Sequence, residues 1–147
     1  GERYNHDHLD LVADSADLIG FNYYYRRAAT PFPADEEIWP AGIRWAIEDL
    51  QTRYGKPLVV MENGLGTNSD AFRQAYLRAH IHRVLSAREE GWDVRGYFHW
   101  SLVDNYEWAQ GWDVRYGLYG LDPADQSLVP KGSAALYRRI VRGEERP

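Results

Sequence analysis

The chain of 147 residues contains no cysteine, which excludes a disulfide framework and a zinc site built from cysteine ligands. No apolar run approaches the roughly 18 residues of a transmembrane helix, so a membrane is not an expected partner. Basic residues are outnumbered: 17 Lys and Arg against 22 Asp and Glu give a formal net charge of −5. Such a balance provides no basic surface for phosphates, so nucleic acid is not an expected partner either. Residues 1–8 are polar and lack a signal-peptide pattern, from which we expect a cytoplasmic location.

Aromatic residues, by contrast, are abundant. The 6 Trp, 11 Tyr and 4 Phe make up 14% of the chain, within an overall composition that is 44% hydrophobic and 27% charged. Those proportions and the length are typical of one folded domain with a single core. The core absorbs part of the aromatic excess, but the excess also suits a site that stacks flat ligands such as sugar rings.

Three apolar runs, at residues 17–25, 58–61 and 94–103, have the composition of strands. The middle run is apolar on both faces, which is typical of a buried parallel strand. Each run is followed by a pattern with helical spacing. The first of these helices is predicted to begin at Pro40 and to end at Gly55.

The two later helices are predicted from their apolar faces and their ends. One begins at Ser69 or Asp70, ends at Gly91 and has an inner face formed by Phe72, Tyr76, Ala79 and Leu85. The other has Ser133 as its N-cap and points Leu136 and Ile140 inward. Repetition of the strand–helix order predicts an α/β fold with a parallel sheet and right-handed crossovers. Periodicity leaves open whether the sheet is doubly wound or part of a (β/α)8 barrel.

Polar residues cluster where the predicted strands end. They are Asn22, Tyr24, Glu62, His99 and Glu107. In both a doubly wound sheet and a (β/α)8 barrel, the carboxyl ends of the parallel strands form the edge that binds ligands. This edge is therefore the expected place of a functional site.

Glu62 is the sharpest candidate, because a carboxylate directly after four apolar residues is costly unless it is paired. It suggests a nucleophile, a base or a ligand, and the alternative is a carboxylate that caps the neighbouring turn. Glu107 lies between Trp100 and Trp108, a pattern that fits a sugar site but also a loop packed on its own aromatic residues. Two glutamates at adjacent strand ends also fit the paired carboxylates of a glycosidase.

Other motifs in the sequence give weaker evidence for a functional site. His6-Asp7-His8 and His80-Ile81-His82 have metal-ligand spacing for an extended segment, but residues two apart on a helix do not face each other. Gly64-Leu65-Gly66 lacks the third glycine of a dinucleotide-binding loop. The acidic run Asp35-Glu36-Glu37 is interpreted as solvated surface. We expect neither a metal site nor a bound cofactor.

Several segments together resemble the C-terminal portion of the family 1 glycoside hydrolases, the retaining β-glucosidase family. Residues 17–24 resemble the family's sixth barrel strand, and residues 40–43 resemble the start of the following helix. Glu62-Asn63-Gly64 is similar to the nucleophile motif on strand seven. Residues 96–108 resemble strand eight and its loop, the most specific of these matches. Shorter matches are Tyr76-Leu77-x-x-His80, Arg115–Leu118 and Lys131–Ser133.

The resemblance implies an α/β fold made of the last three β/α units of a (β/α)8 TIM barrel with parallel strands. Residues 1–147 are then the C-terminal part of a single TIM-barrel glycosidase domain, with strands 6 to 8 and their helices. The implied reaction is hydrolysis of an O-glycosidic bond in a β-glycoside or oligosaccharide through a covalent glycosyl-enzyme intermediate, without a cofactor.

The same resemblance implies a role for each candidate residue. Glu62 is implied to be the nucleophile and Tyr24 the residue that orients it. The implied substrate-binding residues are Asn22, Trp100, Glu107 and Trp108. Glu107 is on this interpretation a sugar ligand and not the second catalytic carboxylate.

Two residues depart from the family pattern. Met61 replaces the usual Thr or Ser before the nucleophile, whose hydroxyl supports the site. Glu36 stands about where many members have a tryptophan that stacks on the aglycone, so contacts to the leaving group should differ.

The sequence also lacks the family's Asn-Glu-Pro segment, which bears the acid/base glutamate on strand four. We therefore expect the isolated chain to be nearly inactive, and to need the missing N-terminal barrel half or self-association to cover its sheet edges. Two alternatives stay open. One is a non-catalytic sugar-binding or assembly remnant of the barrel, and the other is a self-contained doubly wound domain.

Overall fold

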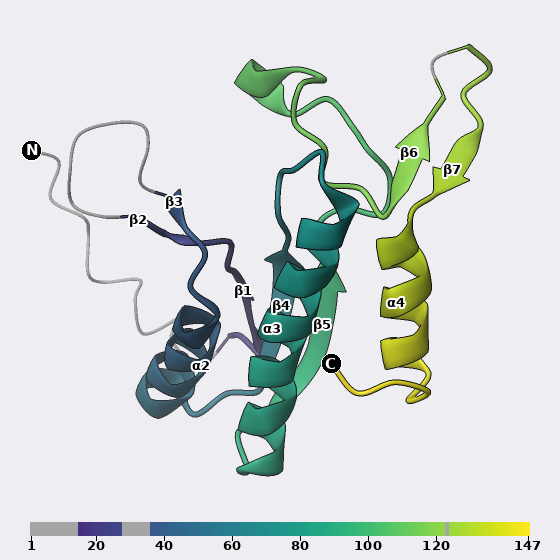
Figure 1. Ribbon diagram of the computed structural model, residues 1–147. Helices are drawn as coiled ribbons and strands as arrows, with labels where there is room; N and C mark the ends of the chain where they lie inside the picture. The colour runs from purple at the N-terminus through teal and green to yellow at the C-terminus, as the bar shows by residue number, and fades with distance from the viewer. Residues whose placement is uncertain (1–14, 28–35, 123) are drawn as a thin grey trace, which may run out of the picture.

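The computed structural model of the chain describes residues 15–27, 36–122 and 124–147. Its centre is a sheet of three parallel strands, β1 (Ile19–Asn22), β4 (Leu58–Asn63) and β5 (Val94–His99), shown in Figure 1. The strand order is β1-β4-β5, so β4 pairs with a neighbour on both sides. The predicted parallel sheet is confirmed, and the three strands end at a common edge.

Two strands are shorter than the apolar runs that predict them. β1 ends at Asn22, and β5 ends at His99, although the third apolar run continues to residue 103. The N–H of Trp100 still donates to the carbonyl of Asn63 in β4, but the next N–H, that of Ser101, donates to the carbonyl of Tyr116 in a later loop at 3.4 Å. Hydrogen bonds to a loop thus replace those to a neighbouring strand. The apolar pattern of the sequence does not show where this change occurs.

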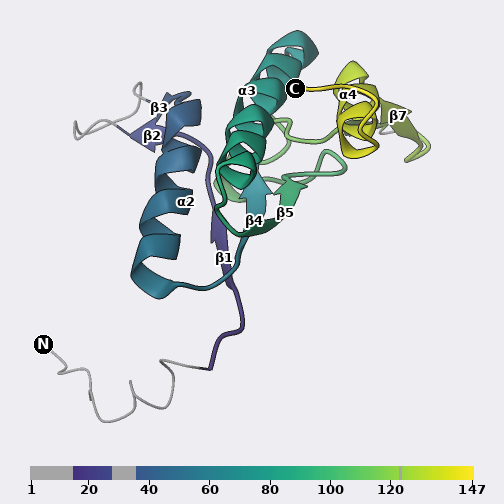
Figure 2. The ribbon, with the colours of Figure 1, turned by 90° about the horizontal axis from the view of Figure 1, so that it is seen from below.

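Three helices alternate with the strands: α2 (Pro40–Tyr54), α3 (Asp70–Glu89) and α4 (Gly132–Val141). α2 begins at Pro40 and ends where Gly55 adopts a left-handed φ of 61°, as predicted. Figure 2 shows α2 and α3 over the same face of the sheet, with α4 beside α3. A doubly wound sheet carries helices on both faces, whereas helices on one face match the wall of a barrel.

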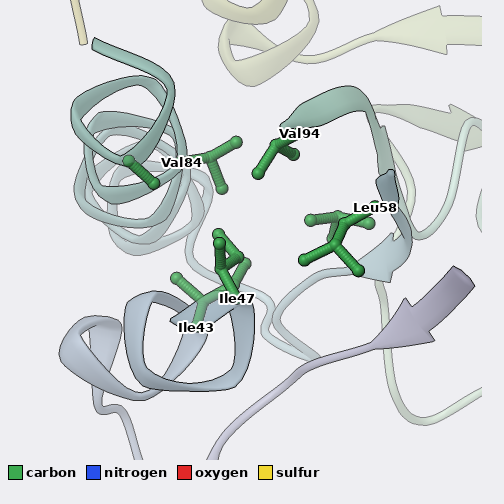
Figure 3. Close-up of a cluster of buried hydrophobic side chains, with 7 residues drawn as sticks. Ile43, Ile47, Leu58, Val84 and Val94 are labelled. Atoms are coloured by element: carbon green, nitrogen blue, oxygen red, sulfur yellow. The ribbon is translucent and has the colours of Figure 1, made fainter. Parts of the chain in front are cut away.

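The main core lies between the sheet and these helices. Leu58 and Val94 from the sheet meet Ile43 and Ile47 from α2 and Val84 from α3, as Figure 3 shows. A second buried cluster joins α3 to α4 and to the chain before β6; it contains Leu77, Ile81, Leu118 and Ala134. The opposite face of the sheet leaves the side chains of Met61 and Phe98 exposed.

The buried face of α3 differs from the predicted one. Its apolar part is formed by Tyr76, Leu77, Ile81, Val84 and Ala87. The Phe72 side chain is 51% exposed, so its predicted inward position is wrong, while that of Tyr76 is confirmed. Ser69 caps the helix by accepting the N–H of Phe72 at 3.3 Å, which places Phe72 in the first turn beside the loop. Ala79 and Leu85 are half-buried.

The N-cap predicted for α4 is also wrong. Lys131 is the N-cap, and Ser133 lies inside the first turn, fully buried. The Ser133 hydroxyl donates to Asp70 Oδ1 at 2.6 Å, and its N–H donates to Asp70 Oδ2 at 3.0 Å. A carboxylate from α3 therefore does the capping, which the local sequence of α4 does not contain. Leu136 is buried as predicted, and Ile140 packs half-buried on the second cluster.

The remaining elements are short. β2 (Arg26–Arg27) pairs with β3 (Glu36–Glu37), β6 (Tyr119–Leu121) pairs with β7 (Leu128–Pro130), and a 3-10 turn η2 spans Trp108–Gln110. Within the described ranges, no helix is long and apolar enough to cross a membrane. The Glu37 side chain is exposed and forms an ion pair with Arg26. The motif His6-Asp7-His8 and Asp35 lie outside the described residues.

Truncation of the fully buried Leu58 tests the core. Leu58→Ala leaves a cavity between β4 and the two helices, and we expect it to lower the free energy of unfolding by about 2–5 kcal/mol in urea titrations. Leu128→Ala, at a side chain that is 54% exposed, is the matched control and should cost less than about 0.5 kcal/mol. Equal losses in the two variants would contradict this description of the core.

Candidate active site

Glu62 lies near the end of β4, beside the chain that leaves β1. Its Oε2 accepts a hydrogen bond from the Tyr24 hydroxyl at 2.6 Å, and its main-chain carbonyl accepts the N–H of Tyr23 at 2.9 Å. Asn22 is the residue of β1 that pairs with Glu62 in the sheet register, and its side chain is exposed. Parallel pairing thus brings three sequence-predicted site residues together at the expected edge.

The Tyr24 phenol is kept protonated. Burial raises its pKa first, and the hydrogen bond to Glu62 raises it further, together with the charge of Glu62, the neighbouring Tyr116 and the charge of Glu107. Tyr24 therefore remains a protonated donor to Glu62 above the pH at which an ordinary tyrosine ionises.

The loop after β5 supplies an indole and a carboxylate to the same edge. Trp100 Nε1 donates to Glu107 Oε1 at 3.2 Å, and both side chains are partly buried. Trp108 follows at the start of η2, with a side chain that is 85% exposed. Tyr106 and Trp112 form an edge-to-face pair with ring centroids 6.0 Å apart. The described part of this loop thus carries the Glu107 carboxylate among several aromatic rings.

An ion pair between Asp104 and Lys131 connects the loop after β5 to the start of α4. Asp104 accepts two hydrogen bonds from Lys131 Nζ, at 2.8 and 2.9 Å, and one from the N–H of Gly117 at 2.8 Å. Burial lowers the pKa of Lys131, and the hydrogen bond to Asp104 opposes that effect. A buried charge pair with its hydrogen bonds satisfied is costly to break, so it restrains the loop.

The two strand ends also approach each other closely at Gly64. A Cβ atom on this residue would lie 2.0 Å from the carbonyl oxygen of Trp100. No side chain fits in that space, so the closeness of β4 and the Trp100 loop depends on glycine.

Sequence reasoning did not single out Asn63 as a site residue. Its side chain is fully buried and makes three hydrogen bonds: Nδ2 donates to the carbonyl of Tyr23 at 2.6 Å and to the hydroxyl of Tyr76 at 2.9 Å, and Oδ1 accepts from Tyr97 at 2.6 Å. An amide two residues after the apolar run 58–61 is the signal that was available. Its partners lie on three separate elements and leave no pattern in the sequence.

His99, one of the polar residues predicted at the edge, faces away from Glu62. Its Nε2 lies 3.1 Å from the carbonyl oxygen of Tyr116, and burial lowers its pKa to about 4. His80 is buried and stacks on the Tyr76 ring, with centroids 3.8 Å apart, whereas His82 is exposed. The ranges that the structure describes contain no group of three or more His, Asp or Glu side chains arranged to hold a metal ion.

A barrel-wall sheet whose carboxyl edge carries a carboxylate and aromatic side chains is the arrangement expected for part of a (β/α)8 glycoside hydrolase. The family model described as glycosyl hydrolase family 1 matches residues 30–146, and the chain belongs to that family.

The relatives agree. The chain is 45% identical over 111 residues to a β-galactosidase of Sulfolobus acidocaldarius, covering 76% of this chain and 23% of the relative. It is 31% identical over 168 residues to β-glucosidase A of Thermotoga maritima, covering 96% of this chain and 37% of the relative.

Solved structures agree as well. The T. maritima β-glucosidase in complex with glucoimidazole matches with a TM-score of 0.86 at 28% identity, covering 96% of this chain and 38% of that one. A β-glycosidase from Pyrococcus horikoshii matches with a TM-score of 0.80 at 35% identity, covering 90% and 36%. The expected partial barrel fold is confirmed, and the chain spans less than two fifths of the length of these relatives.

Acid should destabilise the fold behind the site. Burial lowers the pKa of both His80 and His99 from 6.5 to about 4, so between these pH values the unfolded chain binds protons that the folded chain excludes. The free energy of unfolding is therefore expected to fall as pH decreases from 6.5 to 4, as measured by urea titration at each pH.

A histidine variant identifies the source of that loss. His80→Phe keeps a ring that stacks on Tyr76 but cannot titrate, and we expect it to remove about half of the decrease. His82→Phe changes an exposed side chain and should leave the slope unaltered. The same slope in His80→Phe as in the parent chain would contradict the assignment to the buried histidines.

Proposed function

We propose that the chain is the part of a retaining β-glycosidase that supplies the nucleophile and the wall of the glycone site. The observation that carries this proposal is the 2.6 Å hydrogen bond from Tyr24 to Glu62, which aims a carboxylate at the edge where barrel enzymes bind substrate. No cofactor is invoked, because two carboxylates suffice for the reaction.

In the proposed reaction, a Glu62 oxygen attacks the anomeric carbon and forms a glycosyl ester as the bond to the aglycone oxygen breaks. That oxygen takes a proton from a general acid, and water then hydrolyses the ester. Tyr24 keeps one oxygen of Glu62 hydrogen-bonded, so that Oε1 is available for attack.

The substrate class that fits this wall is a β-glucoside or a related β-glycoside. Trp100 offers an indole face under the sugar ring, and Glu107 offers acceptor oxygens for sugar hydroxyls. Trp108 and Asn22, both exposed at the same edge, complete the proposed glycone contacts. The relatives are named β-galactosidase and β-glucosidase, which supports the class and leaves the sugar to be tested.

We further propose that activity requires the other strands of the barrel, whether in a longer parent chain or in a separate polypeptide. Among the described residues, β1 and β5 each have one unpaired edge, and the sheet face without helices exposes Met61 and Phe98. Covering these surfaces would remove apolar area from water and pair the edges. The general acid would come from the same strands. The cytoplasmic location expected above stays a prediction.

The first test is covalent trapping of Glu62. The chain is incubated with a 2-deoxy-2-fluoro-β-glucoside that bears a good leaving group, because such a substrate needs little acid assistance and its ester hydrolyses slowly. We expect a single adduct in the intact mass, and peptide mapping should place it on Glu62.

Two variants make the trapping specific. Glu62→Gln should give no adduct, whereas Glu107→Gln, which keeps the nucleophile, should still react at a reduced rate. Absence of an adduct in folded chain would favour the non-catalytic remnant. An adduct on Glu107 would contradict the assigned roles.

Turnover of an unactivated substrate tests the dependence on the other strands. General acid–base catalysis contributes about 10²- to 10⁴-fold, so the isolated chain should hydrolyse methyl β-glucoside slower than the whole T. maritima relative by at least that factor. The measurement is glucose release under matched conditions. Comparable rates would show that the described strands carry out the reaction without the proposed complement.

A further inference from the structure

Tyr76 reaches from α3 to the chain that carries Tyr24. Its hydroxyl donates to the main-chain carbonyl of Tyr24 at 2.6 Å and accepts from Asn63 Nδ2 at 2.9 Å. Tyr76 is only 2% exposed, so neither bond competes with water. One phenolic oxygen therefore joins a helix, the residue after Glu62 and the residue that donates to Glu62.

The main chain directly after β1 is bonded to both α3 and β4. Asn63 is adjacent to Glu62 in β4, and its amide also binds the carbonyl of Tyr23 at 2.6 Å. The carbonyls of Tyr23 and Tyr24 are thus both tied to the end of β4. The Tyr24 side chain projects from this segment. The position of its hydroxyl relative to Glu62 should therefore depend on these main-chain hydrogen bonds.

Tyr76 itself has little freedom to move. The His80 ring stacks on it with centroids 3.8 Å apart and an interplanar angle of 26°, and His80 Nδ1 lies 2.9 Å from the Tyr76 carbonyl oxygen. Asn63 is held in turn by the Tyr97 hydroxyl at 2.6 Å. The Tyr76 hydroxyl and the Asn63 amide thus both have hydrogen-bond partners in a buried setting, and removal of the hydroxyl leaves the Tyr24 carbonyl without this donor.

We propose that Tyr76 is a positioning residue that acts through Tyr24: its hydroxyl holds the Tyr24 main chain where the phenol can donate to Glu62. The inference rests on the proposed function of Glu62 as nucleophile. It predicts that loss of the Tyr76 hydroxyl weakens the Tyr24–Glu62 bond, although Tyr76 contacts neither the Glu62 carboxylate nor the substrate edge.

The test observes Tyr24 directly in the full chain labelled with 13Cζ-tyrosine. The Tyr24 signal is assigned by its disappearance in Tyr24→Phe, and Glu62→Ala gives its position without the hydrogen bond. We expect Tyr76→Phe to move the Tyr24 signal at least half of the way toward that position. An unmoved Tyr24 signal in Tyr76→Phe overturns the proposal.

Ser133→Ala is the matched control. The Ser133 hydroxyl is also fully buried and donates from a helix, to Asp70 Oδ1 at 2.6 Å, but it has no bond to Tyr24, Asn63 or Tyr97. It should lower the free energy of unfolding as Tyr76→Phe does but leave the Tyr24 signal in place. Equal movement of the Tyr24 signal in both variants would show a general loosening and overturn the positioning role.

A second substitution covers the case in which Tyr76→Phe does not fold. 3-Fluorotyrosine in place of Tyr76 keeps the ring and the hydroxyl but makes the hydroxyl a stronger donor, and the Tyr24 signal should move by more than its linewidth. A stationary signal overturns the proposal.

The NMR readout does not depend on catalysis, so the two proposals can fail separately. A Tyr24 response without trapping at Glu62 refutes only the proposed function. Trapping without a Tyr24 response refutes only the positioning role.

Discussion

The placement of β4 between two parallel neighbours is the constraint on which the rest of the structure depends. Leu58 and Val60 bury one face of this strand against the helices, so its register cannot slip without exposing them. The register then fixes where Glu62 and Asn63 emerge, with Tyr23 bonded on one side and Trp100 on the other. The candidate nucleophile is thus positioned by core packing several residues away.

Around this strand, buried polar groups hold the loops in addition to apolar contacts such as those of Leu118. Arg73, 1% exposed, binds Asp70 and the carbonyl of Arg115, and so joins α3 to the chain beyond the Trp108 loop. Asp104 and Lys131 connect the same loop to the start of α4. Loops carry their own backbone polar groups, and such side chains satisfy these groups where no ladder exists. Charge pairs and hydrogen bonds are therefore prominent in the support of the loop after β5, whereas the sheet is held mainly by hydrophobic burial.

Sequence predicted best where the cause is local. Pro40 and Gly55 mark the ends of α2 by their own backbone chemistry, and the run 58–61 identifies β4 by its composition. It failed where the partner lies elsewhere in the chain. The cap of α4 comes from Asp70, 63 residues before Ser133, and no local rule anticipates it.

The candidate site follows the same division. An apolar run that ends in a carboxylate was enough to select Glu62. Its contact with Tyr24, 38 residues earlier, has no local pattern and was expected only from the family resemblance. The support behind it, from Asn63 to Tyr76 and Tyr97, became visible only when three elements were packed together. Residue types thus predicted which side chains have chemical roles, and tertiary packing determined which side chains orient them.

Gly64 determines how closely the end of β4 can approach the loop after β5. The carbonyl oxygen of Trp100 occupies the place of a side chain at position 64, so only a hydrogen atom separates the strand of the carboxylate from the loop of the indole. Any larger residue there would meet this carbonyl oxygen and force the two segments apart. The absence of a side chain at position 64 is therefore what lets the main chain that carries Glu62 run directly against the main chain that carries Trp100.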